Sequence, residues 1–140
     1  MADAALRWLP EDSELAQAAL NAEGDTLTLT FSAAAVTRAS GVHEEAGWVR
    51  PLVVDLALNF TEPDGASTPI DWALLRGRLR SSDLRTADGQ QLHRLMLPLQ
   101  LDGPLQWQLH IGQAEPVVLR ARSLRTWPLA ADAFTDSWAC

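Results

Sequence analysis

Alternation of apolar and polar residues along most of this chain predicts β-strands. In TLTLTF, residues 26–31, Leu27, Leu29 and Phe31 alternate with threonine, and in LVVDLALNF, residues 52–60, every second residue is apolar. Successive side chains on a strand point to opposite faces, so a period of two places one row of each strand in a core. The other row of residues 52–60 is also partly apolar, which favours a central position in a sheet.

The C-terminal half contains four further strand-like stretches, near residues 72–82, 91–101, 105–111 and 117–126. The links between them, ADG, DGP and GQAEP, are short, and links of this length join antiparallel neighbours. Gly89 in ADG suits the left-handed conformation that a three-residue hairpin loop needs. The pattern therefore predicts a meander in which these strands pair in chain order.

Matching the apolar rows of these stretches gives an expected register. It sets Leu79 against Leu97, Leu97 against Leu109, and Leu109 against Leu119. Register is strongly specified in such a sheet, because a slip of one residue would turn every side chain to the other face. Pro98 lies inside the second stretch and has no amide hydrogen to donate, so the register beyond it is open to a shift.

The two ends of the chain depart from this alternation. Residues 11–22, EDSELAQAALNA, predict a short helix that Asp12 or Ser13 would cap and that Gly24 would follow. After residue 126 the alternation stops, and residues 127–140 form an apolar tail. This tail needs a place on the sheet or on another subunit.

Length and composition favour one domain of 140 residues, 47% of them hydrophobic. We expect a mainly β fold, with six or seven antiparallel strands in a sandwich or small barrel, an N-terminal helical segment over residues 1–24 and a tail over residues 127–140. No stretch approaches the ~18 consecutive apolar residues of a membrane helix. The N-terminus also lacks the pattern of a secretory signal, which favours a cytoplasmic location. An arginine-rich, lysine-free composition is typical of a bacterial protein.

Several kinds of chemistry have no support in the sequence. Cys140 is the only cysteine, which leaves no intrachain disulfide and no thiolates for a structural zinc site. His43 stands beside Glu44 and Glu45 in an expected acidic loop, but a metal would need further ligands. Glycine-rich phosphate loops and the common hydrolase and zinc-protease motifs are absent from the printed sequence. We therefore expect no metal and no cofactor.

Charge is distributed unevenly along the chain. The net charge is −7, with 12 acidic residues and 3 arginines in residues 1–71, and 6 acidic residues and 8 arginines in residues 72–140. An acidic chain argues against general nucleic-acid binding, which needs a strongly positive surface. Arginines nevertheless occupy alternate positions at Arg76, Arg78 and Arg80.

The expected register places these arginines with other polar residues on the outer face of the sheet. The candidate binding residues on that face are Arg76, Arg78, Arg120, Arg122, Gln100, Gln106, Gln108 and His110. Arginine offers a planar fork for carboxylate or phosphate, and glutamine both donates and accepts. The face would suit an acidic partner protein, an anionic small molecule or a glycan, although no aromatic residue lies among these positions. A plain solvated face, or one covered by the acidic half, is the alternative.

We favour a non-enzymatic binding or accessory domain that uses this polar face. One alternative is a small β-barrel that carries an apolar ligand in its interior. A third is an enzyme, because the same register sets Asp83 opposite His93, and an aspartate that orients a histidine is half of a nucleophilic site. No nucleophile accompanies them, since Ser82 should point to the opposite face. The apolar tail and an open sheet edge also suggest a homo-oligomer.

Overall fold

The computed structural model describes residues 6–40, 43–58, 72–113, 116–129 and 134–136. The described elements are β1 (Leu6–Leu20), β2 (Thr26–Ser40), β3 (His43–Val49), β4 (Leu52–Leu58), the short 3₁₀ helix η1 (Trp72–Leu74), β5 (Gly77–Thr86), β6 (Leu95–Leu97), β7 (Gln100–Ile111), β8 (Val117–Thr126) and β9 (Phe134–Asp136). Within these ranges, no helix has the length and apolar character that crossing a membrane requires. Phe60, Trp138 and Cys140 lie outside the described residues.

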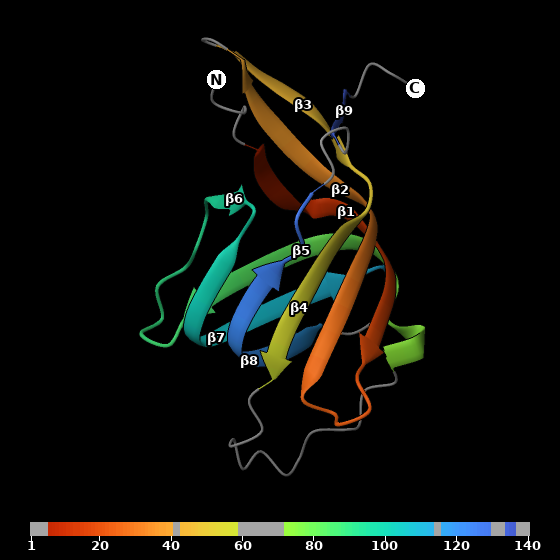
Figure 1. Cartoon of the computed structure of the whole chain (residues 1–140), viewed down its shortest axis with the longest axis vertical. Coiled ribbons are helices and arrows are strands. Elements are labelled where there is room, and N and C mark those ends of the chain that lie inside the picture. The colour runs from red at the N-terminus through yellow and green to blue at the C-terminus, as the bar shows by residue number, and fades with distance from the viewer. Residues whose placement is uncertain (1–5, 41–42, 59–71, 114–115, 130–133, 137–140) are drawn as a thin grey trace.

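Six strands close into an antiparallel barrel, in the order β1, β5, β7, β8, β4 and β2. Closure occurs because β1 also pairs with β2, from Leu20 opposite Leu27 to Leu6 opposite Arg38. Figure 1 shows these strands wrapped around a common interior. The prediction of a mainly β, antiparallel fold is therefore confirmed, and the architecture is a small barrel.

The same nine-stranded sheet extends past one end of the barrel, and we call this extension the projecting sheet. It exists because β1 and β2 are long enough, at 15 residues each, to continue past the barrel wall. The far end of β2 pairs with β3, β3 pairs with β9, and the start of β1 pairs with β6. In Figure 1, β3 and β9 lie at the top, away from the barrel.

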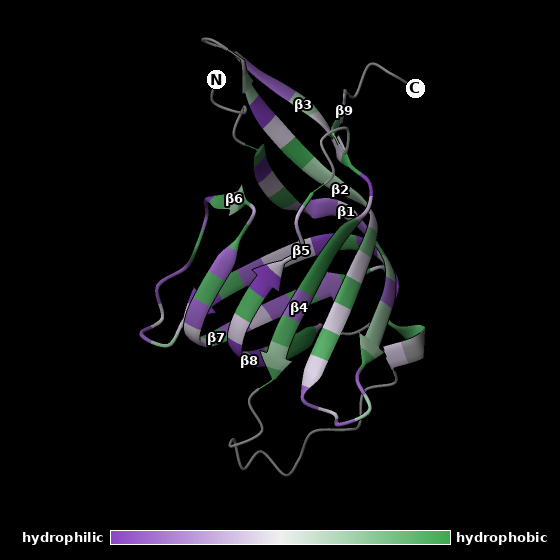
Figure 2. Ribbon diagram, in the orientation of Figure 1, coloured by the Kyte–Doolittle hydropathy of each residue, from purple (hydrophilic) through white to green (hydrophobic). Residues whose placement is uncertain are grey.

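The barrel interior is filled by the apolar rows that the alternation predicts. Trp8, Phe31 and Trp107 meet edge to face at its centre, with ring centroids 5.3 Å and 5.8 Å from Trp8. Fully buried side chains from the barrel strands surround them: Leu15, Leu27, Leu29, Leu52, Val54, Leu79, Leu109 and Leu124. Figure 2 shows the resulting alternation of hydrophobic and hydrophilic positions along the strands. These rows therefore form the hydrophobic core of the described residues.

The predicted helix over residues 11–22 is wrong, because residues 11–20 belong to β1 and residues 21 and 22 to the turn that follows it. Its register against β2 shifts three times, between Leu9 and Glu14, between Glu14 and Leu15, and between Leu15 and Gln17. Residues without a partner interrupt the alternation, so the buried positions of β1 fall at unequal spacings that mimic a helical repeat. Gly24 does adopt a left-handed conformation, with φ of 77°, but it does so in the turn between β1 and β2.

The predicted four-strand meander is wrong in two of its three pairings, because Leu97 lies opposite Leu6 of β1 and not opposite Leu79 or Leu109, and the expected DGP link lies inside β7. Residues 91–101 do not form a single strand against β5: β6 pairs with β1 instead, and Pro98 separates β6 from β7. β5 pairs directly with β7, with Leu84 opposite Trp107. The pairing of β7 with β8 is confirmed in its faces, but Trp107 lies opposite Leu119 and the register differs by two residues from the expected one.

The predicted turn at ADG is confirmed. Gly89 is left-handed, with φ of 86°, and its amide donates to the Thr86 carbonyl at 2.9 Å. The Thr86 hydroxyl donates to the Asp88 carboxylate. This hydrogen bond, followed by one from the Gln90 amide, lowers the pKa of Asp88 below its usual value.

Candidate binding surface on the outside of the barrel

The outer face of β5, β7 and β8 carries a row of planar polar side chains. Arg85 of β5 lies opposite Gln106 of β7, and Gln106 lies opposite Arg120 of β8. Gln108 occupies the next outward position on β7. Arg122 is exposed beside the row, at a bulge of β8 between Ala121 and Ser123. We call the set Arg85, Gln106, Gln108, Arg120 and Arg122 the Arg/Gln face.

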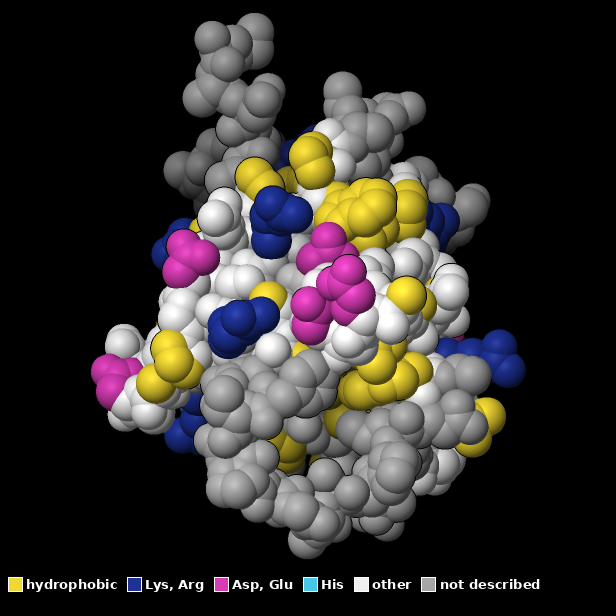
Figure 3. Space-filling view, turned by 60° about the horizontal axis from the view of Figure 1, so that its bottom comes forward, with side chains coloured by type: hydrophobic (Ala, Val, Ile, Leu, Met, Phe, Trp, Pro, Cys, Tyr) yellow, Lys and Arg dark blue, Asp and Glu magenta, His cyan; other side chains and the backbone are white. Residues whose placement is uncertain are grey.

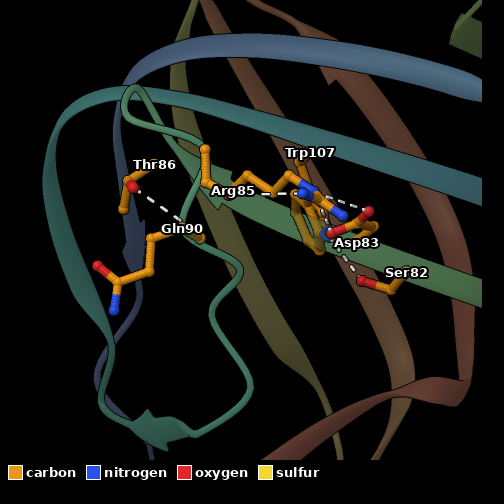
Figure 4. Close-up of polar contacts among 7 residues, drawn as sticks. Ser82, Asp83, Arg85, Thr86, Gln90 and Trp107 are labelled. Atoms are coloured by element: carbon orange, nitrogen blue, oxygen red, sulfur yellow. Dashed lines mark hydrogen bonds and ion pairs between the residues drawn. The ribbon is translucent and has the colours of Figure 1, made fainter.

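A surface ion pair holds one end of this face. The Asp83 carboxylate lies 3.0 Å from Nε of Arg85, with both side chains partly exposed (Figure 4). Such exposed pairs add little to stability, but this one orients the guanidinium. Ser82, just before Asp83 in sequence, points inward and accepts a hydrogen bond from Nε1 of Trp107 at 2.7 Å (Figure 4). β5 therefore separates a polar outer row from the core.

The alternating arginines that precede this face lie elsewhere. Arg76 is exposed just before β5, and Arg78 pairs across to Glu14 of β1. The Arg78 guanidinium forms an ion pair with Asp12. The expected row of Arg76 and Arg78 beside the glutamines is wrong because β5 pairs with β7 and β1. The acidic N-terminal part does neutralise one arginine, as the alternative interpretation expected.

The two remaining polar candidates also have defined places. His110 is half-buried near one end of β7, opposite Ser81. Gln100 lies near the other end of β7, opposite Arg125 of β8. Gln100 is thus separated from Gln106 by the bulge at Asp102 to Leu105. Neither His110 nor Gln100 belongs to the central row of the Arg/Gln face.

Gln100 and Arg125 belong to a second polar row that crosses four strands. Arg125 lies opposite Asp55 of β4, and Asp55 lies opposite Thr28 of β2. Beside this row is a groove of about 550 Å³, which we call the Trp127 groove. It is lined by Asp55, Pro98, Leu99, Gln100, Arg125, Thr126, Trp127 and Pro128.

Trp127 is the functional candidate that the sequence analysis missed. The sequence pattern places Trp127 in the C-terminal tail. In the structure, its indole Nε1 donates to Oδ2 of Asp55 at 2.7 Å and its amide donates to the Val53 carbonyl at 2.9 Å. The available signal was the outward alternation Ser123, Arg125, Trp127, which continues one step past the expected strand end. An aromatic residue therefore does lie on the polar side of the barrel.

Asp83 and His93 are not paired, because the expected register holds at the bridge between Arg85 and Gln91 but does not extend to His93, which lies outside the strands. Asp83 lies opposite Gln108 on the outer face. His93 is exposed in the segment before β6 and lines a separate pocket of about 350 Å³ with Ser82, Trp8 and other residues, Asp83 not among them.

Charges of both signs occur together on the outer surface. Figure 3 shows acidic and basic side chains close to one another, beside hydrophobic ones, on the face turned toward the viewer.

In the projecting sheet, Glu45 forms an ion pair with Arg38 at 2.6 Å, whereas the His43 side chain is outside the described residues. Across the described ranges, no three histidine, cysteine or acidic side chains gather as a metal site would require.

Comparisons of this chain with known protein families, with curated proteins and with solved structures found no match.

Proposed function

We propose that this chain is a non-enzymatic binding domain that docks an acidic partner protein on the Arg/Gln face. The observation that carries the proposal is the cross-strand row Arg85, Gln106, Arg120, with Arg122 beside it. Adjacent strands place these side chains about 4.8 Å apart, so that one carboxylate-bearing segment can meet several of them at once. Three arginines and one aspartate, Asp83, which pairs with Arg85, lie in this small area, which is thus locally basic in a chain whose net charge is −7.

The rigidity of the barrel supports an external site. The outward-facing residues of the described strands present the polar recognition groups, whereas the inward-facing rows are apolar and buried. Because the Arg/Gln side chains stand on paired strands, docking costs little backbone ordering. Arginine binds carboxylates through two parallel hydrogen bonds, and glutamine can accept or donate beside it. An anionic small molecule would use the same donors.

The experiment is capture of partners from native-host lysate by the immobilised protein at about 50 mM and about 500 mM salt, since exposed charges are screened over roughly 3–10 Å in this range. The test variant is Arg120→Glu/Arg122→Glu. The control is Arg50→Glu/Arg94→Glu, which changes the net charge equally at exposed positions outside the face.

We expect a partner that is retained at low salt, released at high salt, lost with the test variant and retained by the control. This combination assigns the interaction to the Arg/Gln face by charge complementarity. A partner that binds the wild type and the test variant equally at both salt concentrations would overturn the proposal and place the interface elsewhere.

A further inference from the structure

We propose that the Trp127 groove binds a neutral saccharide, with the Trp127 ring stacked on a pyranose and with Asp55, Gln100 and Arg125 bound to its hydroxyl groups. This site is separate from the Arg/Gln face, and it does not depend on the docking of an acidic partner there.

Trp127 is held in place while half of its surface stays open. The side chain is 50% exposed, although its Nε1 is engaged with Asp55 and its backbone amide with Val53. Since the polar atom of the indole already has its partner, the exposed part of the ring offers apolar and π surface. A large exposed aromatic ring in a fixed orientation is a ready platform for stacking.

The Asp55 carboxylate is also held by hydrogen bonds, and it can accept further ones. Oδ1 accepts the Thr28 hydroxyl and Oδ2 accepts the Trp127 indole, each at 2.7 Å. An ionised carboxylate has about four lone-pair sites, so each oxygen can accept one more hydrogen bond. Arg125 and Gln100 follow on the next two strands, which adds donors and a second acceptor in the same row.

The floor and rims of the groove are rigid. Oγ1 of Thr126, a buried residue, accepts the Leu99 amide at 2.8 Å, and the Thr126 amide donates to the Leu99 carbonyl at 2.9 Å. This reciprocal pair joins the start of β7 to the end of β8. Pro98 and Pro128, which have no amide hydrogen, form apolar parts of the lining.

A sugar ring matches this combination of groups better than an ion does. One face of a pyranose presents C–H bonds, whereas its edge carries hydroxyls that each donate and accept. The groove offers the aromatic face of Trp127, the acceptor Asp55 and the donor Arg125. It also offers the side-chain amide of Gln100, which can both donate and accept. Asp55 would repel an anion and Arg125 would repel a cation, which favours a neutral ligand. The volume of about 550 Å³ lies within the usual range for small-molecule sites.

A proline-rich peptide is the competing occupant, since aromatic grooves bind such segments. Trp127 donates its indole hydrogen to Asp55, which leaves no indole donor for a peptide carbonyl. The saccharide therefore fits the fixed hydrogen bonds better, and the peptide serves as a competing probe in the test.

The experiment follows the indole N–H signals of the ¹⁵N-labelled full chain by NMR during titration with cellohexaose, maltohexaose and N-acetylchitohexaose to about 10 mM, a concentration that detects millimolar binding. The Trp127 signal is identified by its loss in Trp127→Phe. We expect one oligosaccharide to shift this signal saturably while the signals of the buried Trp8 and Trp107 stay in place.

Two variants and a control complete the test. Trp127→Ala should weaken binding about tenfold or more, as truncation of a central aromatic contact does. Asp55→Asn should also weaken it, although the amide can still accept from Trp127 and donate to the Thr28 hydroxyl.

Arg120→Glu/Arg122→Glu should bind the saccharide normally, so a failure of acidic-partner docking and a failure of this proposal remain distinguishable. An unmoved Trp127 signal with all three oligosaccharides, or one moved only by a proline-rich peptide, would overturn the proposal.

Discussion

At the scale of single residues, two serine hydroxyls allow the barrel to bury two tryptophans. Ser13 is completely buried, and its Oγ accepts Nε1 of Trp8 at 3.1 Å and the Ala35 amide at 3.0 Å while donating to the Leu9 carbonyl at 3.1 Å. All of its hydrogen-bonding capacity is used. A bulge in β1 brings Ser13 inward, so an irregularity of the strand completes the core.

Replacement of Ser13 with alanine should therefore destabilise the protein strongly. Ser13→Ala leaves the indole N–H of Trp8 and the amide of Ala35 without their acceptor, and each buried orphan donor costs about 1–3 kcal/mol. We expect a loss of about 2–4 kcal/mol in the free energy of unfolding, measured by urea denaturation.

The matched control is Ser81→Ala, an exposed serine on β5, for which the change should lie within about 0.5 kcal/mol. Equal stabilities of the two variants would contradict the role assigned to Ser13.

At the scale of elements, the C-terminal strand β9 depends on the absence of a side chain in β3. A Cβ at Gly47 would lie 2.5 Å from the Thr135 carbonyl oxygen and 2.6 Å from the Phe134 ring. The Arg38 guanidinium lies 4.1 Å from the centroid of the same ring. Phe134 thus packs on the strand where glycine leaves room, which gives part of the predicted apolar tail a place on the chain's own sheet.

The substitution Gly47→Ala should release β9 while the barrel stays folded. A methyl group at this position overlaps backbone as well as ring atoms, so β9 must move. We expect limited proteolysis to remove the C-terminal segment at least about tenfold faster than in the wild type, because local opening controls such cleavage.

Ala46→Ser, at the neighbouring exposed position of β3, is the control and should be cleaved at the wild-type rate. Unchanged cleavage of Gly47→Ala would show that β9 does not need the space at this glycine.

The strands with unbroken alternation could be predicted from the sequence, and those with bulges could not. β4 keeps a strict period of two, and its buried row from Leu52 to Leu58 matches the expected face. β1 contains register shifts, and Asp12 has a positive φ of 75°. The buried residues of β1 therefore do not recur at every second position. The partner of β5 depends on contacts distant in sequence, which local alternation does not encode.

At the scale of the whole molecule, closure of the sheet determines which parts of the expected polar face come together. Gln106, Gln108 and Arg120 are neighbours as expected, because β7 and β8 pair. Arg78 belongs beside β1, because the same β5 strand must close the barrel. The sequence therefore predicted which residues of these strands face outward. It did not predict which strands lie on either side of β5, because that depends on the closure of the barrel.

The strands at both edges of the projecting sheet are short. Its outermost strands, β6 and β9, have three residues each, and edge strands of this length limit uncontrolled pairing with other chains. Self-association through the tail stays a prediction, since only Phe134–Asp136 of the segment after Leu129 is described.

Docking on the Arg/Gln face can be observed by mapping amide chemical shifts with a glutamate-rich peptide as an acidic probe. We expect the amide signals of Gln106, Gln108 and Arg120 to shift saturably at about 50 mM salt and to return toward their free positions at about 500 mM. Shifts confined to the projecting sheet, or a spectrum that the peptide leaves unchanged, would contradict this expectation.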